Sequence, residues 1–358
     1  MIRLLLAGAI AFVLSALLTR VLIKVLTTSR IGQPIREDGP QGHMIKAGTP
    51  TMGGLAIVAA ALGAYGLSDL ISDLAGVGST ITNTGLLVMA AIGSAGLVGF
   101  LDDWIKVSRE RNLGLNARLK TAGLLMVAIL FAVLMVRLTG VHTELSFARY
   151  GVPGWDLGSI GWVIWAVILI YATSNAVNLT DGLDGLAGGS GIFSFSAYAV
   201  IGFWIFRQNS DPTVLVDIYD IPHALDIGVV AVAMLAACAG FLWFNAAPAE
   251  IFMGDTGSLA IGTGLAALAL VTNTHLLLPV IGGIYVLETA SVMAQVAFFK
   301  VTRGRRLLRM APVHHHFELL GWAETKVIIR FWLVAGGLTL AGLALFYADW
   351  VATADIRR

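Results

Sequence analysis

The sequence predicts an all-α polytopic membrane protein with about ten transmembrane helices. Of its 358 residues, 57% are hydrophobic and only 13% are charged, and the mean hydropathy is +0.83. Globular proteins carry about a quarter charged residues, roughly twice this fraction. The apolar runs match the ~20 residues that cross a bilayer. In lipid such runs must be helices, because their backbone groups find no other hydrogen-bond partners.

Ten apolar segments follow one another, with no alternation typical of a membrane barrel and no appended soluble domain. We therefore expect one transmembrane domain over residues 1–358. The first segment lacks a small-residue cleavage site, which predicts a retained helix rather than a removed signal peptide. Only a short polar turn, residues 272–275, separates the eighth segment from the ninth. The segments run near Ile2–Leu26, Gly53–Leu70, Thr82–Leu101, Leu119–Val141, Ile160–Val177, Leu186–Phe206, Ile227–Phe244, Leu259–Thr274, Leu276–Phe299 and Val327–Trp350.

The basic residues predict the orientation of these helices. The loops after even-numbered segments contain few basic residues, chiefly Arg149 and Arg207. Because cytoplasmic loops carry an excess of Lys and Arg, we expect the loops after odd-numbered segments inside and both termini outside the cytoplasm. The loops after segments one, three and nine hold Arg30, Arg36, Lys46, Lys106, Arg109, Arg111, Arg118, Lys300, Arg303, Arg305, Arg306 and Arg309.

The outer loops hold fewer polar clusters. Val141–Ser159 contains Pro153-Gly154 and a weakly alternating stretch, which favours a small hairpin. Arg207–Asp226 is acidic and could form a short helix on the membrane surface. The single cysteine, Cys238, excludes an intramolecular disulfide. The sequence shows no basic-aromatic patch, so we expect no nucleic-acid partner.

Asp102 and Asp103 end an apolar run that holds no charge from Leu86 to Phe100. Two adjacent carboxylates at such a position must stay hydrated, paired or metal-bound. Their mutual repulsion favours a cation between them, either Lys106 or a divalent ion. Taken alone, the pair would favour the simpler interpretation as the ordinary charged end of a membrane helix, but similar polar clusters occur at other loop ends.

Each of the other expected cytoplasmic loops also carries a polar cluster. Together the five loops indicate one composite site at a single membrane face. The four other clusters are Lys46–Gly54, Asn175–Gly185, Asn245–Ser258 and Pro312–Glu318.

Several of these clusters have a structural alternative. Gly53-Gly54 could serve only the close packing of helices. In that case Lys46 would be the part of this cluster that contacts an anion. Asn175, Asn178, Asp181 and Asp184 recur every three residues, as on one helical stripe, and could form interhelical hydrogen bonds. Asp255 lies between glycine-rich neighbours that suit a backbone approaching a phosphate or an ion.

The histidines His314, His315 and His316 are internal, so they are no expression tag. Consecutive residues in regular structure cannot all face one ion, which disfavours zinc. Their position between Arg309 and Glu318 favours contact with phosphate or a leaving group. Carboxylates together with cations are what magnesium-assisted phosphoryl transfer uses. A Walker-type glycine loop is absent, which disfavours an ATPase.

These motifs resemble a known family. Asp102-Asp103-x-x-Lys106, Asn178-Leu-Thr-Asp181-Gly-Leu-Asp184-Gly, Phe252-Met-Gly-Asp255-Thr-Gly-Ser and Pro312-Val-His-His-His-Phe-Glu318 are similar to those of the polyprenyl-phosphate N-acetylhexosamine-1-phosphate transferases. Within that superfamily, Gly48–Gly54 and His314–Glu318 resemble the bacterial phospho-N-acetylmuramoyl-pentapeptide-transferases (translocase I).

The resemblance implies a Mg²⁺-dependent enzyme of the bacterial inner membrane whose site faces the cytoplasm. Such an enzyme transfers phospho-MurNAc-pentapeptide from UDP-MurNAc-pentapeptide to undecaprenyl phosphate, forming lipid I and UMP in peptidoglycan synthesis. A homodimer is also implied. The implied metal ligand is Asp255, and the implied catalytic set is Asp102, Asp103, Asp255, Asp181, His314 and His315. The implied substrate-binding set is Lys46, Lys106, Asn178, Asp184, Asn245, Phe252 and His316.

Two rival functions stay open. A sister enzyme would use UDP-GlcNAc or UDP-GalNAc for another polymer, and the histidine string argues against it. A transporter would need ionisable groups near the bilayer midplane and access from both faces. The acids gather at one edge instead, which favours the enzyme.

Overall fold

The computed structural model describes residues 1–28, 48–109, 114–209, 221 and 224–356. Its described part contains ten helices that are long and apolar enough to cross a membrane. These are α1 (Ile2–Thr28), α2 (Gly54–Leu74), α3 (Asn83–Ser108), α4 (Ala117–Leu138), α5 (Gly158–Thr180), α6 (Leu186–Asn209), α7 (Ala224–Asn245), α8 (Gly254–Val271), α10 (Gly283–Val301) and α12 (Glu324–Ile356). The predicted fold class, a polytopic all-α membrane protein, is confirmed.

The core of the bundle is α8. Of its most apolar window 94% is buried, against 17% for α10 and 22% for α1. It packs against α3, α5 and α2, while α7 packs between α6 and α1. Small residues make this close packing possible: a side chain at Gly262 would lie 2.5 Å from the backbone of Ser174 in α5. Because α8 is enclosed by other helices, the side chains in its first turn have fixed surroundings.

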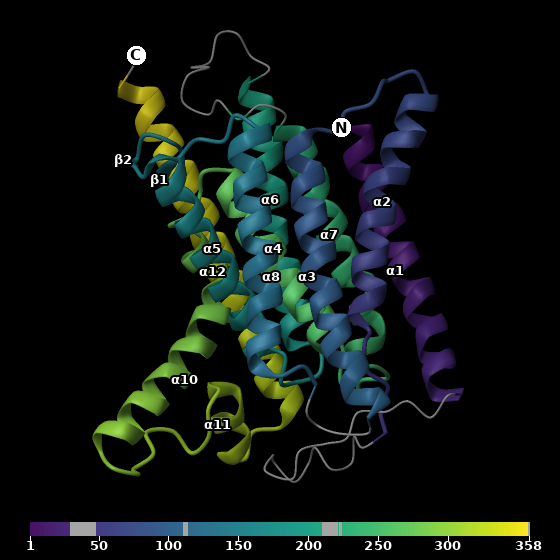
Figure 1. Cartoon of the computed structure of the whole chain (residues 1–358), viewed down its shortest axis with the longest axis vertical. Coiled ribbons are helices and arrows are strands. Elements are labelled where there is room, and N and C mark those ends of the chain that lie inside the picture. The colour runs from purple at the N-terminus through teal and green to yellow at the C-terminus, as the bar shows by residue number, and fades with distance from the viewer. Residues whose placement is uncertain (29–47, 110–113, 210–220, 222–223, 357–358) are drawn as a thin grey trace.

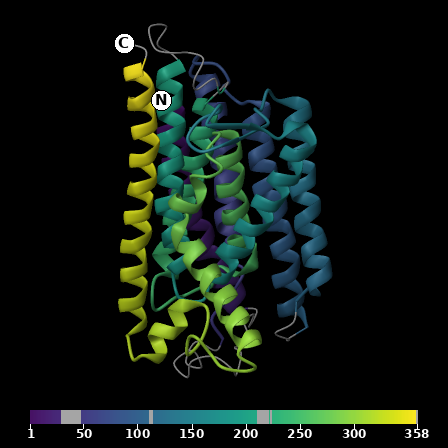
Figure 2. The same ribbon diagram turned by 90° about the vertical axis from the view of Figure 1, so that its left-hand side faces the viewer.

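Both ends of the described chain lie at the same end of the bundle. Figure 1 shows α1 beginning and α12 ending at the top, and Figure 2 shows the same from the side. The last turns of α3, the first turn of α8 and the short helix α11 (Val313–Leu319) lie at the opposite end. The termini therefore lie at one end of the bundle, and the elements that carry the predicted site clusters meet at the other.

The predicted hairpin is present between α4 and α5. Strand β1 (Glu144–Ser146) pairs antiparallel with β2 (Pro153–Asp156), and Glu144 lies opposite Asp156. The short surface helix expected in Arg207–Asp226 falls largely on residues 210–220 and 222–223, outside the described residues.

Among the helix boundaries that differ from the predicted ones, four change the path of the chain or the position of a site residue. Helix α3 continues to Ser108, so Asp102 and Asp103 lie on the helix and not in a loop. Helix α8 begins at Gly254, earlier than the apolar run, because its first turn is capped by Asp103. The ninth segment was expected to be one helix, but it bends at Gly282 between the short helix α9 (Leu278–Ile281) and α10.

The fourth boundary concerns the expected stripe of Asn175, Asn178, Asp181 and Asp184. Helix α5 ends at Thr180, and Asp181 begins a turn in which Gly185 has a φ of +75°. That backbone conformation favours glycine. The stripe therefore continues only as far as Asn178, and the two acids lie on the turn that leads into α6.

Candidate active site

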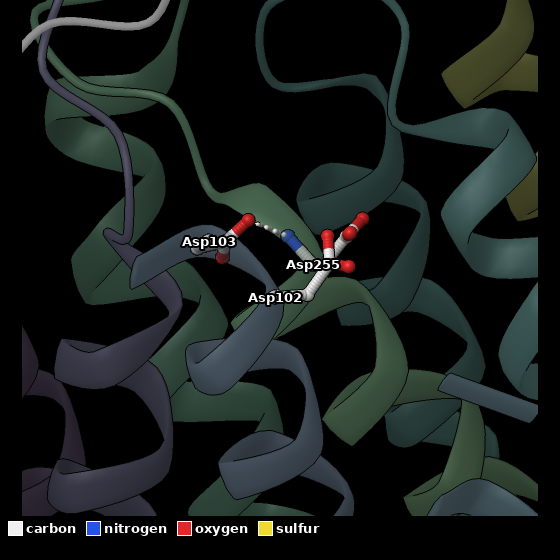
Figure 3. A group of neighbouring side chains, drawn as sticks. All are labelled: Asp102, Asp103 and Asp255. Carbon is white, nitrogen blue, oxygen red and sulfur yellow. Dashed lines mark hydrogen bonds between the residues drawn. The ribbon is translucent and has the colours of Figure 1, made fainter. Parts of the chain in front are cut away.

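The centre of the candidate site is formed where α3 ends and α8 begins. Asp102 and Asp103 come from the last two turns of α3, and Asp255 comes from the first turn of α8. Figure 3 shows the three side chains meeting between these helices. Gly99, one turn before Asp102, permits this approach, since a side chain there would lie 2.2 Å from the backbone oxygen of Asp255.

Asp103 caps the N-terminus of α8. One carboxylate oxygen accepts from the backbone N–H of Asp255 (3.1 Å), which Figure 3 draws as a dashed line. The other accepts from the N–H (2.9 Å) and the hydroxyl (2.8 Å) of Thr256. A carboxylate at this position also interacts favourably with the helix dipole. Gly254, at φ +74°, leaves room for it, because a side chain there would lie 2.5 Å from Asp103. Asp103 therefore fixes the position of Asp255.

Two lysines lie against the acids. The Nζ of Lys106 is 2.5 Å from Asp102, 2.7 Å from Asp255 and 3.7 Å from Asp103. The Nζ of Lys120, in the first turn of α4, is 2.8 Å from the same oxygen of Asp255. Asp102 also accepts from the N–H of Leu115 (2.8 Å), which ties the chain before α4 to α3. Two ammonium groups therefore neutralise part of the charge of three nearly buried carboxylates.

The acidic group has the composition of a magnesium site. One oxygen from each of Asp102, Asp103 and Asp255 lies within 4.8 Å of the others, and all three residues are buried. Carboxylate oxygens are the ligands that Mg²⁺ prefers. Asp255 is the member whose carboxylate faces both lysines and is not used as a helix cap. The residues present therefore fit a divalent ion.

The end of α5 contributes an amide and an acid. The amide nitrogen of Asn178 donates to Asp255 and to the hydroxyl of Ser258 (2.8 Å). Asp181 follows one turn later, and its removal from water raises the pKa of this carboxyl well above its usual range. The negative charges of Asp255, Asp103 and Asp184 act in the same direction. Asp181 therefore belongs to the same electrostatic cluster.

The three histidines on α11 have different partners. His314 is fully buried, and its Nδ1 lies 3.1 Å from Glu288 of α10. His315 pairs with Glu318 at 2.7 Å, and His316 accepts from the backbone N–H of Arg309 (3.0 Å). Among the described residues, the group of three acids is the cluster that could hold a metal, and no histidine belongs to it. These contacts agree with the expectation that the histidines do not share one zinc ion.

The histidine helix lies against the turn that carries Asp181. A side chain at Gly182 would lie 2.5 Å from the Nε2 of His314 and 3.4 Å from the Nε2 of His315. A side chain at position 182 would therefore collide with His314, so glycine here allows the histidines to approach the turn. The clusters on α3, α5, α8 and α11 thus meet in one region, although they are far apart in the sequence.

Asp184, Asn245 and Phe252, from the implied substrate-binding set, lie beside this region. Asp184 accepts from the N–H of Ala249 (3.0 Å), and Asn245 donates to the carbonyl of Ile251 (2.8 Å). These bonds fix the loop from Asn245 to Met253. Phe252, at the end of that loop, is partly exposed. Lys46 lies outside the described residues.

The glycine-rich stretch before α2 serves close packing. The N–H groups of Gly53 and Gly54 donate to the carbonyls of Phe252 and Met253 (2.9 and 2.8 Å). A side chain at Gly54 would lie 2.0 Å from the backbone nitrogen of Gly257 in α8. This geometry supports the packing alternative for Gly53-Gly54, and it holds the Phe252 loop beside the acids.

Sequence reasoning did not select two residues that the structure places here. Lys120, in the first turn of α4, contacts Asp255 and was in none of the expected polar clusters. Glu288 is the one charged residue between Leu276 and Phe299. An ionisable residue inside an apolar run is itself a signal of function, and that signal could have identified Glu288.

Comparison with known proteins identifies related sequences over nearly the whole chain. Residues 84–273 match the model of glycosyl transferase family 4, and residues 46–58 match phospho-N-acetylmuramoyl-pentapeptide-transferase signature 1. The phospho-N-acetylmuramoyl-pentapeptide-transferase of Corynebacterium efficiens is 47% identical, over 99% of this chain and 100% of its own. Those of Streptomyces griseus (48%) and Saccharopolyspora erythraea (50%) match over 98% of this chain and 99% and 98% of theirs.

Proposed function

Because the chain belongs to the phospho-N-acetylmuramoyl-pentapeptide-transferase family, we propose that it forms lipid I and UMP in a Mg²⁺-dependent reaction. The substrates are UDP-MurNAc-pentapeptide and undecaprenyl phosphate. The observation that carries the proposal is the group of Asp102, Asp103 and Asp255 with Lys106 and Lys120 against it. Such a combination binds and neutralises phosphate groups, which is the main requirement of phosphoryl transfer.

The reaction exchanges one diphosphate linkage for another. An oxygen of the lipid phosphate attacks the sugar-bearing phosphorus, a new P–O bond forms, and the bond to the departing UMP breaks. The bonds formed and broken are alike, so the step is near thermoneutral and needs positioning and charge neutralisation rather than an energy source.

The residues divide this work according to their contacts. Mg²⁺ held by Asp255, with Asp102 and Asp103 beside it, would supply positive charge to the diphosphate oxygens. Lys106 and Lys120 hold Asp255 and are the ammonium groups nearest to incoming phosphate. We assign His314 and His315, which lie against the turn of Gly182, and Asp181 in the same turn to the surroundings of the departing phosphate. Asp102 is the acid that we assign to the lipid phosphate, because Asp103 is committed to the cap of α8.

A site at the end of the transmembrane bundle suits a substrate whose tail stays in the lipid. The acids lie at the ends of membrane-spanning helices, so a phosphate at the bilayer surface can reach them. We propose that this end faces the cytoplasm of a bacterial inner membrane, with both termini outside. Support comes from the basic residues that gather at the same end as the site. A homodimer remains a prediction from the family resemblance.

We favour direct attack by the lipid phosphate over a covalent enzyme intermediate. A phosphate monoester is already ionised at neutral pH and needs little activation. Incubation of the purified protein with the labelled UDP-sugar alone tests this preference. The expected result is no protein-bound phosphoryl group, and isolation of a phosphoryl-aspartate would overturn direct attack.

The experiment that tests the proposed function is identification of both products by mass spectrometry. Purified protein, Mg²⁺, UDP-MurNAc-pentapeptide and undecaprenyl phosphate should give equal amounts of UMP and a lipid-linked phospho-MurNAc-pentapeptide. UMP without the lipid product would indicate simple hydrolysis and would contradict the proposal.

A further inference from the structure

Helix α10 is the transmembrane helix with the least cover from the rest of the chain. Figure 1 shows its second half directed away from the bundle at the lower left. Met293 is 68% exposed and Val301 83% exposed, and Val296 and Phe299 are about half-exposed. In a bilayer these side chains contact acyl chains, since no described helix covers them.

A strongly basic loop follows α10. With Lys300 in the last turn of α10, it brings five exposed cations together within ten residues, the others being Arg303, Arg305, Arg306 and Arg309. No acidic residue occurs from Thr289 to Phe317. Within the described part of the chain, none of these five cations makes an ion pair. A concentration of uncompensated positive charge therefore adjoins the lipid-facing helix.

The loop and the helix border an open cavity of about 660 Å³. Its apolar wall comes from α10, through Val292, Val296 and Phe299. Three of the five cations also line it, Lys300, Arg306 and Arg309. One cavity thus combines a hydrocarbon surface with a cationic end.

Hydrogen bonds hold the loop beside this cavity in place. The side-chain oxygen of Gln295 accepts from the N–H groups of Leu307 (3.0 Å) and Leu308 (2.8 Å), which fastens the loop to α10. The N–H of Arg309 donates to His316, which fastens the other end of the loop to α11. Arg306 additionally donates to the carbonyl of Arg309 (3.5 Å). The cavity is therefore formed by the folded chain itself.

We propose that this cavity binds an anionic phospholipid of the surrounding bilayer. Its phosphate would lie among Lys300, Arg306 and Arg309, and an acyl chain would lie along Val292, Val296 and Phe299. A basic pocket at the end of a transmembrane helix is suited to anionic headgroups. A nucleotide sugar could use the cations but has no hydrocarbon for the apolar wall. The three catalytic carboxylates are on α3 and α8, whereas α10 packs against α5, α9, α11 and α12. The cavity is thus separate from the three carboxylates, and its loop is joined through Arg309 to His316 on α11.

The charge pattern of the loop supplies a matched control. Arg306→Gln with Arg309→Gln removes two cations that line the cavity, and Arg303→Gln with Arg305→Gln removes two from the same loop that do not. The net charge changes equally in both double variants. All four positions are exposed, so both variants should fold, and their melting temperatures in detergent check this.

The test is native mass spectrometry of the full chain titrated with phosphatidylglycerol or phosphatidylcholine. Wild type and the control variant should retain one phosphatidylglycerol, and the cavity variant should bind it at least tenfold more weakly, from about fivefold per cation. Equal weakening in both variants would mean general charge attraction only and would overturn the site. Equal retention of phosphatidylcholine would also overturn it. So would displacement of phosphatidylglycerol by equimolar undecaprenyl phosphate, which would make the cavity a substrate site, or by a second copy of the chain.

Discussion

The Nζ of Lys106 lies 2.7 Å from the Oδ2 of Asp255, although 149 residues separate them in the sequence. This contact joins the end of α3 to the start of α8 at the centre of three carboxylates. The proposed reaction depends on that junction. Lysine beside a possible metal ligand also indicates that charge at the site is kept balanced as phosphate enters and leaves.

Replacing Asp255 tests the metal assignment. Asp255→Asn keeps the size of the side chain but removes the charge that holds Lys106, Lys120 and a divalent ion. Loss of metal-assisted charge stabilisation is worth several kcal/mol, so we expect kcat to fall on the order of 10³-fold. UMP release at saturating Mg²⁺ measures this. Asp73→Asn, an exposed acid at the other end of α2, is the control. Near-normal Mg²⁺-dependent turnover by Asp255→Asn would refute the assignment.

Asp103 should behave as a structural cap. Asp103→Ala removes the acceptor for two backbone N–H groups and the hydroxyl of Thr256, at a cost of about 2 kcal/mol. Asp103→Asn keeps one acceptor oxygen and should have an intermediate melting temperature. Melting temperatures in detergent measure this order, and Asp102→Asn, which leaves the cap of α8 in place, is the comparison. Equal melting temperatures for Asp103→Ala and wild type would show that the cap adds nothing to stability.

The buried pair of Glu288 and His314 separates stability from activity. Removing one partner leaves buried polar atoms of the other without a partner, at a cost of about 1–3 kcal/mol, whereas replacing both by apolar residues can be neutral. We expect Glu288→Leu and His314→Leu each to lower the melting temperature, and the double variant to recover most of it. UMP release should stay low in all three, because His314 is assigned to the leaving phosphate. A double variant with recovered activity would remove His314 from the catalytic set.

Asp181 predicts a pH-dependent stability. Its pKa is raised by burial and by neighbouring acids, so the folded protein binds a proton more tightly there than the unfolded chain does. The carboxyl therefore destabilises the fold above its unfolded pKa of about 4, and the cost is largest above the raised folded pKa. Asp181→Asn should melt higher than wild type at pH 8, and the difference should shrink towards pH 4. A gain that is the same at both pH values would contradict this origin.

Two glycines of α2 provide a test of close packing. Gly54→Ala would place a side chain 2.0 Å from the nitrogen of Gly257, so it must separate α2 from α8 and displace the Phe252 loop. Gly66→Ala, in the same helix, has nothing within 4 Å and should be neutral or stabilise the helix by about 1 kcal/mol. Melting temperatures and the KM for the UDP-sugar measure both effects. Comparable behaviour of the two variants would show that the contact at Gly54 is not limiting.

The helices could be predicted from the sequence because each apolar run is long and lipid permits little else. Their ends could not. The apolar run before Asp102 ends at Leu101, but the helix continues because the side chains that follow have partners on α8 and in the segment before α4. Similarly, α8 starts before its apolar run because Asp103 caps it from another helix.

The site was predictable as a set of motifs but not as a set of contacts. Which residue meets which depends on helix packing, so neither the Lys120–Asp255 pair nor the Glu288–His314 pair follows from local spacing. The assignment of Asp103 illustrates the difference. Sequence reasoning treated Asp102 and Asp103 as one acidic pair, whereas the structure gives Asp103 a capping contact and leaves Asp102 beside Lys106.

The most direct test of the proposed reaction is UMP release from two UDP-sugars, with and without a chelator. Purified protein and undecaprenyl phosphate are mixed with UDP-MurNAc-pentapeptide or UDP-GlcNAc in the presence of Mg²⁺. We predict UMP from UDP-MurNAc-pentapeptide alone, its loss on chelation, and its return when Mg²⁺ is restored. Release from UDP-GlcNAc at a similar rate, or release that persists in the chelator, would contradict a Mg²⁺-dependent transfer of phospho-MurNAc-pentapeptide.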